Sequence, residues 1–378
     1  MAAQPVVFRN CMPSSVWSRR AAAAAGPQLF AGLTPAMGAA AGGAVPGEVA
    51  LPDRVRIVEV GARDGLQNER RVVPAEDRAR LVSMLVERCG LRTVEVGSFV
   101  SEKWVPQMAG SGDVLRSVRS ALARSSGAPP RWAGGYNSLR LPVLTPNMKG
   151  FQMAVDAGAE EVAVFAAASE GFSRRNINCS VDESLRRYRD VCDAAREAGT
   201  AVRGYVSTVA GCPFDGVVHP GDVARVAAEL LEMGCYEVSL GDTIGVGTPN
   251  TIDAMIAAVL EAGCPPEQLA VHFHDTYGMA VANIMVALRH NISVIDSAVA
   301  GLGGCPYAPG AGGNVATEDV VYLMDGLGID TGGVRLDELV SAGDFICGIL
   351  GKQTDSRVGR ARAAVRAKAA ARQQQQSR

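Results

Sequence analysis

From residue 55 onward, short runs of β-branched and other apolar residues alternate with longer stretches rich in Ala, Leu, Arg and Glu. This alternation is typical of repeated strand–helix units that build a parallel sheet. Eight strands are predicted, at residues 55–61, 93–99, 141–147, 161–169, 202–209, 237–244, 269–276 and 292–299. The third is the least strand-like, because Pro142 and Pro146 lack the N–H groups that a ladder needs.

The stretches between the strands have the spacing of amphipathic helices. In residues 76–89, Leu81, Val82 and Leu85 fall on one side and the charged side chains elsewhere. Gly90 ends this segment, and a glycine stands in the same way before later strands. These later positions are Gly158, Gly199, Gly234 and Gly263.

Eight such units over about 270 residues match the size of a (β/α)8 barrel. The predicted fold is therefore an α/β TIM barrel at 51–352 with a C-terminal helical extension, from helices at 317–327 and near 336–350. A doubly wound nucleotide-binding fold is the alternative. It would place a G-x-G-x-x-G turn after the first strand, where this chain has GARDGLQN.

The two ends of the chain differ from its centre. Residues 1–47 contain three arginines and no acidic residue before Glu48, so we predict that residues 1–50 are a transit peptide. The mitochondrial matrix is the expected destination, with another organelle or a merely disordered Ala-rich segment as alternatives. Residues 353–378 are rich in Arg, Ala and Gln without a wide apolar stripe, which predicts a flexible, exposed tail.

Composition narrows the class of ligand. Hydrophobic residues make up 48% of the chain, charged residues 20%, and the net charge is -2, so we expect a small-molecule substrate and no nucleic acid. No stretch is apolar enough to predict a membrane span. The nine cysteines form no C-x-x-C pair, which argues against a zinc ribbon or a dense disulfide framework.

Candidate metal ligands lie where the strands end, which is where TIM barrels carry their reactive groups. His272 and His274 are two positions apart on one predicted strand, so both imidazoles face the same way and can chelate one ion. A structural pair is the alternative, but the chain has only four histidines. Barrel closure brings Asp64 towards them, and Asn314 adds an amide oxygen. This nitrogen and oxygen shell predicts Mg²⁺ or Mn²⁺.

Other polar residues at the same edge suggest carbon–carbon bond chemistry beside a carbonyl. Arg63 can stabilise an enolate oxygen, unless it only forms a surface ion pair. Glu95 and Asp242 could orient Arg63 or a metal-bound water, or balance buried charge. Cys305, in the glycine-rich loop 301–314, could act as an acid or base or be a small apolar filler. A barrel used only for binding would need none of these groups.

Several segments closely resemble the 3-hydroxy-3-methylglutaryl-CoA lyase family, and the likeness runs from about residue 55 to residue 352. They are VEVGARDGLQNE, VEVGSFVSEKWVPQM, NMKGFQMAVDAGAEEVAVF, SLGDTIGVGTPN, VHFHDTYGMAVANI and GLGGCPYAPGAGGNVATEDVVYL. Isopropylmalate and homocitrate synthases share the R-D-G-x-Q and H-x-H elements and are the alternative. They resemble the GGCPYAPGAGGN loop less and usually carry further domains.

The resemblance implies cleavage of 3-hydroxy-3-methylglutaryl-CoA to acetyl-CoA and acetoacetate, in leucine degradation and ketone-body formation, by a homodimer. It implies that Mg²⁺ or Mn²⁺ is bound by Asp64, His272, His274 and Asn314. It also implies that Arg63 contacts the substrate and the enolate, that Cys305 takes part in catalysis, and that Glu95, Asp242 and Glu318 are supporting acids, Glu318 on the substrate side.

Two roles remain open within the resemblance. The enolate needs a proton donor, and a histidine such as His272, a metal-bound water or Cys305 could serve. The coenzyme A phosphates need cations at the mouth of the barrel, where Arg174, Arg175 and Lys103 follow predicted strands. A solvated loop is the other interpretation of these three residues.

Overall fold

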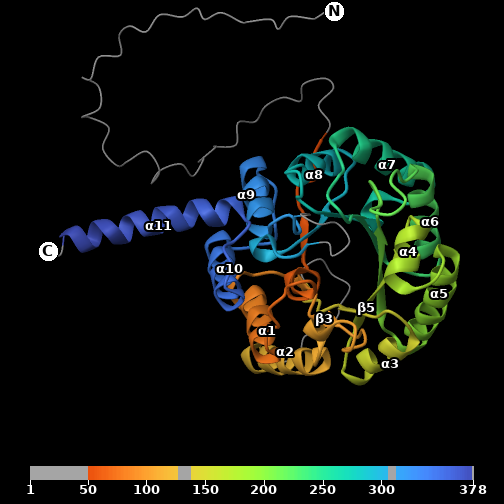
Figure 1. The fold of residues 1–378 in the computed structure, drawn as a ribbon, viewed down its shortest axis with the longest axis horizontal. Helices are drawn as coiled ribbons and strands as arrows, with labels where there is room; N and C mark the ends of the chain where they lie inside the picture. Colours follow the sequence, from red (N-terminus) through yellow and green to blue (C-terminus); the bar gives the residue numbers. More distant parts are fainter. Residues whose placement is uncertain (1–49, 127–137, 305–311, 377–378) are drawn as a thin grey trace, which may run out of the picture. The chain divides into compact units, whose positions relative to one another are not determined.

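The computed structural model describes residues 50–126, 138–304 and 312–376 (Figure 1). Its strands all pair in parallel. They are β1 (Arg56–Glu59), β2 (Thr93–Val94), β3 (Gly97–Ser98), β4 (Val143–Leu144), β5 (Glu161–Ala167), β6 (Ala201–Ser207), β7 (Glu237–Asp242), β8 (Leu269–Phe273) and β9 (Val294–Ser297).

The sheet closes on itself through β2 and β3. These are two halves of one extended stretch, interrupted only at Glu95 and Val96. β2 pairs with β1, at one end of the strand order, and β3 pairs with β4, at the other. Between them, Glu95 N donates to Glu59 O at 2.9 Å and Val96 N to Pro142 O at 3.0 Å. The predicted TIM barrel is therefore confirmed, with one strand position for each predicted strand.

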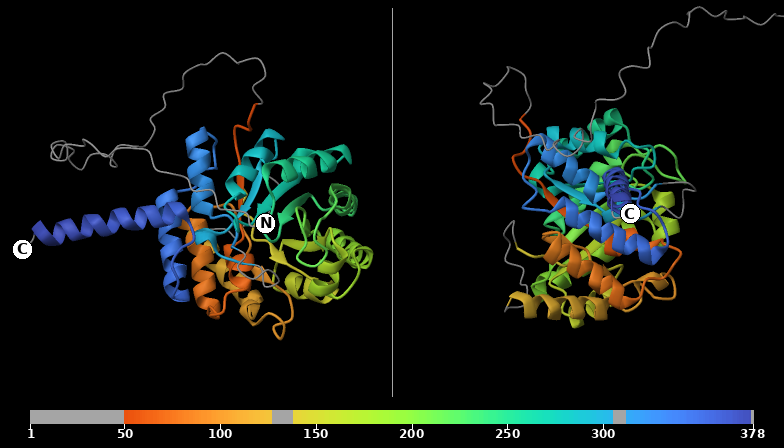
Figure 2. Two further views of the ribbon diagram at one scale, coloured as in Figure 1. Left: turned by 45° about the horizontal axis from the view of Figure 1, so that its top comes forward. Right: turned by 90° about the vertical axis from the view of Figure 1, so that its left-hand side faces the viewer.

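Helices surround the strands (Figures 1 and 2). They are α1 (Ala75–Ser83), α2 (Ser111–Ser126), α3 (Met148–Asp156), α4 (Glu170–Ile177), α5 (Val181–Ala198), α6 (Pro220–Glu232), α7 (Pro249–Glu261), α8 (Ala280–Arg289), α9 (Thr317–Leu327), α10 (Leu336–Leu350) and α11 (Arg357–Gln376). A further helical turn, Met84–Arg88, continues α1, so the predicted helix at 76–89 is present. Apolar side chains such as Val164 on β5 and Leu185 on α5 are buried between the two layers.

Two predicted strands are shorter than expected. The strand expected at 141–147 is reduced to Val143–Leu144, because Pro142 and Pro146 cannot donate to the ladder. The strand expected at 93–99 is split where Glu95 and Val96 turn from one neighbour to the other. Both departures lie where the barrel closes.

The C-terminal segment also differs from the prediction. The helices expected at 317–327 and 336–350 are present as α9 and α10, but the segment expected to be a flexible tail contains α11. Its Ala, Arg, Lys and Gln residues are strong helix formers, so no wide apolar stripe is needed. Asp319 accepts hydrogen bonds from Arg357 N and Val358 N at 3.0 and 2.9 Å, which caps the first turn.

The predicted transit peptide at 1–50 lies outside the described residues except for Ala50. Over the parts of the chain that are described, no helix combines the length and apolar character that crossing a membrane requires.

Candidate active site and metal centre

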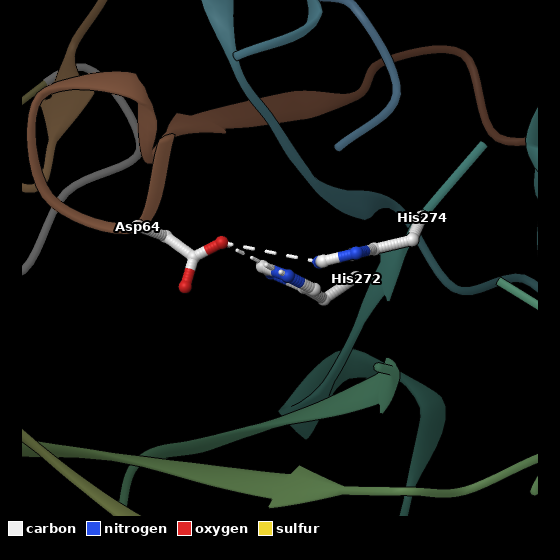
Figure 3. Close-up of side chains that lie close together, drawn as sticks. All are labelled: Asp64, His272 and His274. Atoms are coloured by element: carbon white, nitrogen blue, oxygen red, sulfur yellow. Dashed lines mark ion pairs between the residues drawn. The ribbon is translucent and has the colours of Figure 1, made fainter. Parts of the chain in front are cut away.

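Three side chains that could hold a metal ion converge at the carboxyl ends of the strands (Figure 3). Asp64 lies in the helical turn Gly61–Gly65 directly after β1, His272 on β8, and His274 one residue beyond its end. Asp64 Oδ2 is 3.8 Å from His272 Nε2 and 3.9 Å from His274 Nε2. The ligand atoms all lie within 4.8 Å of one another, close enough for one cation to contact all three.

Asn314 completes the group from the other side. Its backbone bridges that of His274, and its Nδ2 donates to Asp64 Oδ2 at 2.8 Å and to Leu302 O at 3.1 Å. Its Oδ1 is buried without a hydrogen-bond partner among the described residues. Rotating the amide by half a turn would present this oxygen beside Asp64, as a hard cation requires. A carboxylate, two imidazoles and an amide oxygen therefore fit a divalent cation that takes mixed nitrogen and oxygen ligands.

The charges of the ligands suit a cation. Burial opposes ionisation of Asp64, but Arg63 and the two histidines outweigh it and lower its pKa to about 2. Burial and the neighbouring His272 lower the pKa of His274 to about 4, against the opposing effect of Asp64. At neutral pH the site therefore offers an anionic carboxylate and an uncharged imidazole, the forms that bind metals.

Arg63 is held rigidly beside the candidate metal site. Its Nε and Nη2 both lie 2.7 Å from Glu95 Oε2, and its Nη1 lies 2.7 Å from Asp64 Oδ1. Burial lowers the pKa of Arg63, but Glu95 and Asp64 more than compensate, so the net shift is upward. Of the roles open to Glu95, its contacts favour orienting Arg63, because both hydrogen bonds fix the guanidinium plane.

Asp296 on β9 is a functional candidate that the sequence did not single out. Its Oδ2 lies 3.3 Å from His272 Nδ1 and accepts hydrogen bonds from Ser239 Oγ and Arg203 Nη1. Burial opposes its ionisation, but Arg203 prevails and lowers the pKa of Asp296. An anion at Nδ1 holds the proton there and leaves the Nε2 lone pair directed at Asp64. The available signal was one acidic residue within an otherwise uncharged strand.

Glu59 on β1 is a second residue that the sequence reading missed. Its Oε1 accepts hydrogen bonds from Gly61 N at 2.8 Å and Val299 N at 2.9 Å, and its Oε2 from Thr317 Oγ1 at 2.6 Å. Burial raises the pKa of Glu59 to about 7. This carboxyl joins the turn that carries Asp64 to the segments that follow β9, so it fixes the position of a ligand without touching the cavity.

The predicted supporting acids Asp242 and Glu318 organise backbone segments that follow strands of the barrel. Asp242 accepts hydrogen bonds from Val246 N and Gly247 N at 3.1 and 2.7 Å, and so organises the loop after β7. Glu318 is buried on α9, and both its oxygens lie 3.0 Å from Ala300 N. Neither carboxyl is among the described residues that line the cavity, so the substrate contact of Glu318 and the catalytic role of Asp242 stay predictions.

A cavity of about 1070 Å³ opens over the carboxyl ends of the strands, and Arg63, Asp64, His272 and His274 line it. Arg175 also lines the cavity. The other two predicted coenzyme contacts, Arg174 and Lys103, do not, and Arg174 pairs instead with Glu170 at 3.3 Å on an exposed face. The predicted catalytic Cys305 lies outside the described residues.

A parallel barrel whose cavity combines a carboxylate–imidazole cluster with a buried arginine defines a class: metal-dependent TIM-barrel enzymes. The HMGL-like family model matches residues 54–346. The chain belongs to the HMGL-like family, and the resemblance found in the sequence is thereby confirmed. Together with relatives named as lyases, this indicates an enzyme that cleaves a carbon–carbon bond.

Named relatives agree with this assignment. The hydroxymethylglutaryl-CoA lyase of mitochondria from Rattus norvegicus is 55% identical over 311 residues, covering 82% of this chain and 90% of the relative. The solved structure of hydroxymethylglutaryl-CoA lyase from Pseudomonas aeruginosa has a TM-score of 0.76 and 55% identity, covering 83% of this chain and 99% of that one.

Two further relatives bear on the ligand and the compartment. The HMG-CoA lyase from Acinetobacter baumannii, solved in complex with coenzyme A and 3-methylmalate, has a TM-score of 0.73 and 31% identity, covering 83% of this chain and 97% of that one. A relative from Mus musculus named as cytoplasmic is 52% identical over 311 residues, covering 82% of this chain and 85% of the relative.

Proposed function

We propose that this protein cleaves 3-hydroxy-3-methylglutaryl-CoA to acetyl-CoA and acetoacetate, the reaction that contributes to leucine degradation and ketone-body formation. The observation that carries the proposal is the convergence of Asp64, His272 and His274 beside the rigid Arg63 in one large cavity. The names of the relatives support the same substrate.

The reaction begins with transfer of the proton of the tertiary hydroxyl of the substrate to a base in the cavity, such as a water molecule. The proton that the enolate carbon gains at the end balances this loss. Collapse of the alkoxide to a ketone breaks the adjacent carbon–carbon bond and leaves the electron pair on the enolate of acetyl-CoA. Mg²⁺ or Mn²⁺ held by Asp64, His272, His274 and Asn314 would supply the positive charge that lowers the pKa of the hydroxyl. Protonation of the enolate carbon then gives acetyl-CoA.

Arg63 is placed to stabilise the enolate oxygen. Its guanidinium keeps its charge throughout, and Glu95 and Asp64 fix its direction before the substrate arrives. Such preorganised charge stabilises a developing anion more than a mobile side chain does, because no reorganisation is needed during the reaction.

The enolate carbon requires a proton donor. His272 directs Nε2 towards Asp64 and has Nδ1 beside Asp296, so neither ring nitrogen is free to carry a proton to the enolate. We therefore assign the protonation to Cys305, with a water molecule as the alternative.

Arg175 lies at the wall of the cavity, and we assign it to binding the coenzyme A phosphates.

The domain assignment follows from the extent of the barrel. We assign residues 51–352 to the catalytic domain of a homodimer. We also assign residues 1–50 to a transit peptide for the mitochondrial matrix or, alternatively, another organelle. Several relatives are named as mitochondrial, and one as cytoplasmic.

A substrate comparison tests the proposed function. Purified protein with Mn²⁺ is expected to release acetoacetate from 3-hydroxy-3-methylglutaryl-CoA, and to form no condensation product from acetyl-CoA and 2-oxo acids. Condensation without cleavage would transfer the assignment to the isopropylmalate and homocitrate synthase type.

A further inference from the structure

Residues 352–358 link α10 to α11 and include the first two residues of α11. This segment contacts three loops at the carboxyl end of the barrel and is called here the C-terminal strap. Lys352 Nζ lies 2.8 Å from Glu69 Oε1, in the loop after β1. Arg357 Nη1 lies 2.5 Å from Asp275 Oδ2, in the loop after β8. The strap also reaches the turn after β9, through a backbone hydrogen bond to Ala300.

Each of these loops carries one candidate metal ligand. Asp64 precedes Glu69 in the loop after β1, and His274 directly precedes Asp275. Asn314 is bonded to the same turn as Ala300, because its Nδ2 donates to Leu302 O at 3.1 Å. The strap therefore bonds to the three loops that must meet for the ligands to converge.

The strap is anchored in the protein interior. Ser356 is fully buried, and its Oγ donates to Asp319 Oδ1 at 2.7 Å, while Gly359 N donates to Ser356 Oγ at 2.9 Å. The carboxylate of Asp319 also accepts the first N–H groups of α11. Because a buried serine and the cap of a helix hold it, the strap has a defined position from which to restrain the loops.

Its contact with Ala300 fixes a strained residue. Ala300 has φ 61°, a left-handed conformation that is unfavourable for a residue with a Cβ. Its N–H donates to Glu318, and its carbonyl accepts from Asp355 N at 2.9 Å, so it is held from both sides. Strain of this kind persists only where the surroundings impose it, and it is found at functional sites.

We propose that the C-terminal strap positions the metal-ligand loops and thereby sets the affinity of the site for a divalent cation, with Arg357 and Lys352 as positioning residues. The inference rests on the metal site of the proposed function but not on the substrate. An isolated ion pair at the surface contributes little, so the strap acts through several contacts anchored at Ser356.

A double-mutant cycle with Mn²⁺ as the probe tests the contact between Arg357 and Asp275. Arg357→Ala and Asp275→Asn are each expected to weaken Mn²⁺ binding about threefold, in the range expected for one exposed pair. The double variant should bind Mn²⁺ no more weakly than the weaker-binding of the two single variants, because both changes remove the same contact. Arg357→Lys should restore most of the affinity, since it keeps the charge.

Arg366→Ala is the matched control. It removes the pair between α11 and Asp344 of α10, at 2.9 Å and outside the strap, and should leave Mn²⁺ affinity unchanged. Wild-type Mn²⁺ affinity in Arg357→Ala, or fully additive losses in the cycle, would overturn the proposal.

Truncation tests the strap as a whole. A chain ending at Arg360 keeps the strap and its cap and should bind Mn²⁺ normally, whereas a chain ending at Gly351 should bind at least about tenfold more weakly, because it loses all the strap contacts together. If the shorter chain does not fold, hydrogen exchange tests the strap instead. It is measured at residues 61–69 and 273–280 in the full-length Arg357→Ala variant. Faster exchange there than in Arg366→Ala supports the proposal, and equal exchange overturns it.

These measurements separate the strap proposal from the proposed function. If Mn²⁺ binding depends on the strap but the protein has no lyase activity, only the proposed function is wrong. A wild-type protein that binds no Mn²⁺ would overturn the strap proposal, because there would be no cation affinity for it to set.

Discussion

Asn314 Nδ2 lies 2.8 Å from Asp64 Oδ2, although 250 positions separate the two residues in the chain. The contact exists because β9 pairs with both β1 and β8, so the segments that follow these strands meet at one edge of the barrel. The same closure brings His272 and His274 to Asp64. The candidate metal site is thus a product of the fold, assembled from segments that have no local relationship.

Removing His274 should abolish tight Mn²⁺ binding. In His274→Ala one of the three converging ligands is lost, and the fold should remain because the side chain lines a cavity. His290→Ala is the matched control, since that histidine pairs with Asp253 at 2.8 Å away from the site. Mn²⁺ titration followed by electron paramagnetic resonance, with circular dichroism to check folding, measures the effect. Unchanged binding would remove His274 from the ligand set.

Neutralising Asp296 should weaken metal binding through His272. Asp296→Asn removes the anion that holds the proton on Nδ1, and such changes behind a metal ligand lower affinity about 10- to 100-fold. It also leaves the buried Arg203 with one charged partner fewer, so the melting temperature should fall. Ser239→Ala, which removes only a neutral hydrogen bond to the same carboxylate, should weaken Mn²⁺ binding less. Equal effects would contradict the assigned role.

Arg63→Lys should separate catalysis from metal binding. Lysine keeps the charge beside Asp64, but it cannot contact Glu95 and Asp64 with a planar fork. We expect kcat to fall by about 100-fold or more, with Mn²⁺ affinity within a few-fold of wild type. Steady-state kinetics with the acyl-CoA substrate measure the first, and Mn²⁺ titration the second. A change in KM alone would indicate a binding role instead.

The pH dependence of stability should report Glu318. Burial raises its pKa to about 8, so the folded protein keeps a proton that the unfolded chain releases above about 4.5. The contribution of the neutral Glu318 carboxyl to the free energy of unfolding is therefore fully present below pH 4.5 and is lost as the pH rises through 8. Relative to Glu318→Gln, the wild-type melting temperature should fall by several degrees between pH 5 and pH 8. Parallel profiles of the two proteins would contradict this.

Much of the fold could be predicted from sequence, because each strand–helix unit carries its own local signal. The exceptions have local causes. Prolines at 142 and 146 shorten one strand, and Glu95 and Val96 divide another where the sheet closes. The helix α11 was missed because an amphipathic stripe was expected, whereas its residues have high intrinsic helix propensity and Asp319 supplies its cap.

The ligands of the candidate site could be predicted because they combine a chelating spacing with strand-end positions. The residues that support them could not. Asp296 and Glu59 are buried carboxyls whose partners lie far away in the chain, such as Arg203 and Val299. Their roles depend on contacts that only the closed barrel creates.

A titration of metal-free protein with Mn²⁺ tests the central claim, that this cluster holds the catalytic cation. Bound Mn²⁺ and the rate of acetoacetate release from 3-hydroxy-3-methylglutaryl-CoA are measured on the same samples. We predict that the rate rises in proportion to bound Mn²⁺ and saturates at one ion per chain, with His274→Ala showing neither. Full activity in the metal-free protein, or activity unrelated to bound Mn²⁺, would contradict the account.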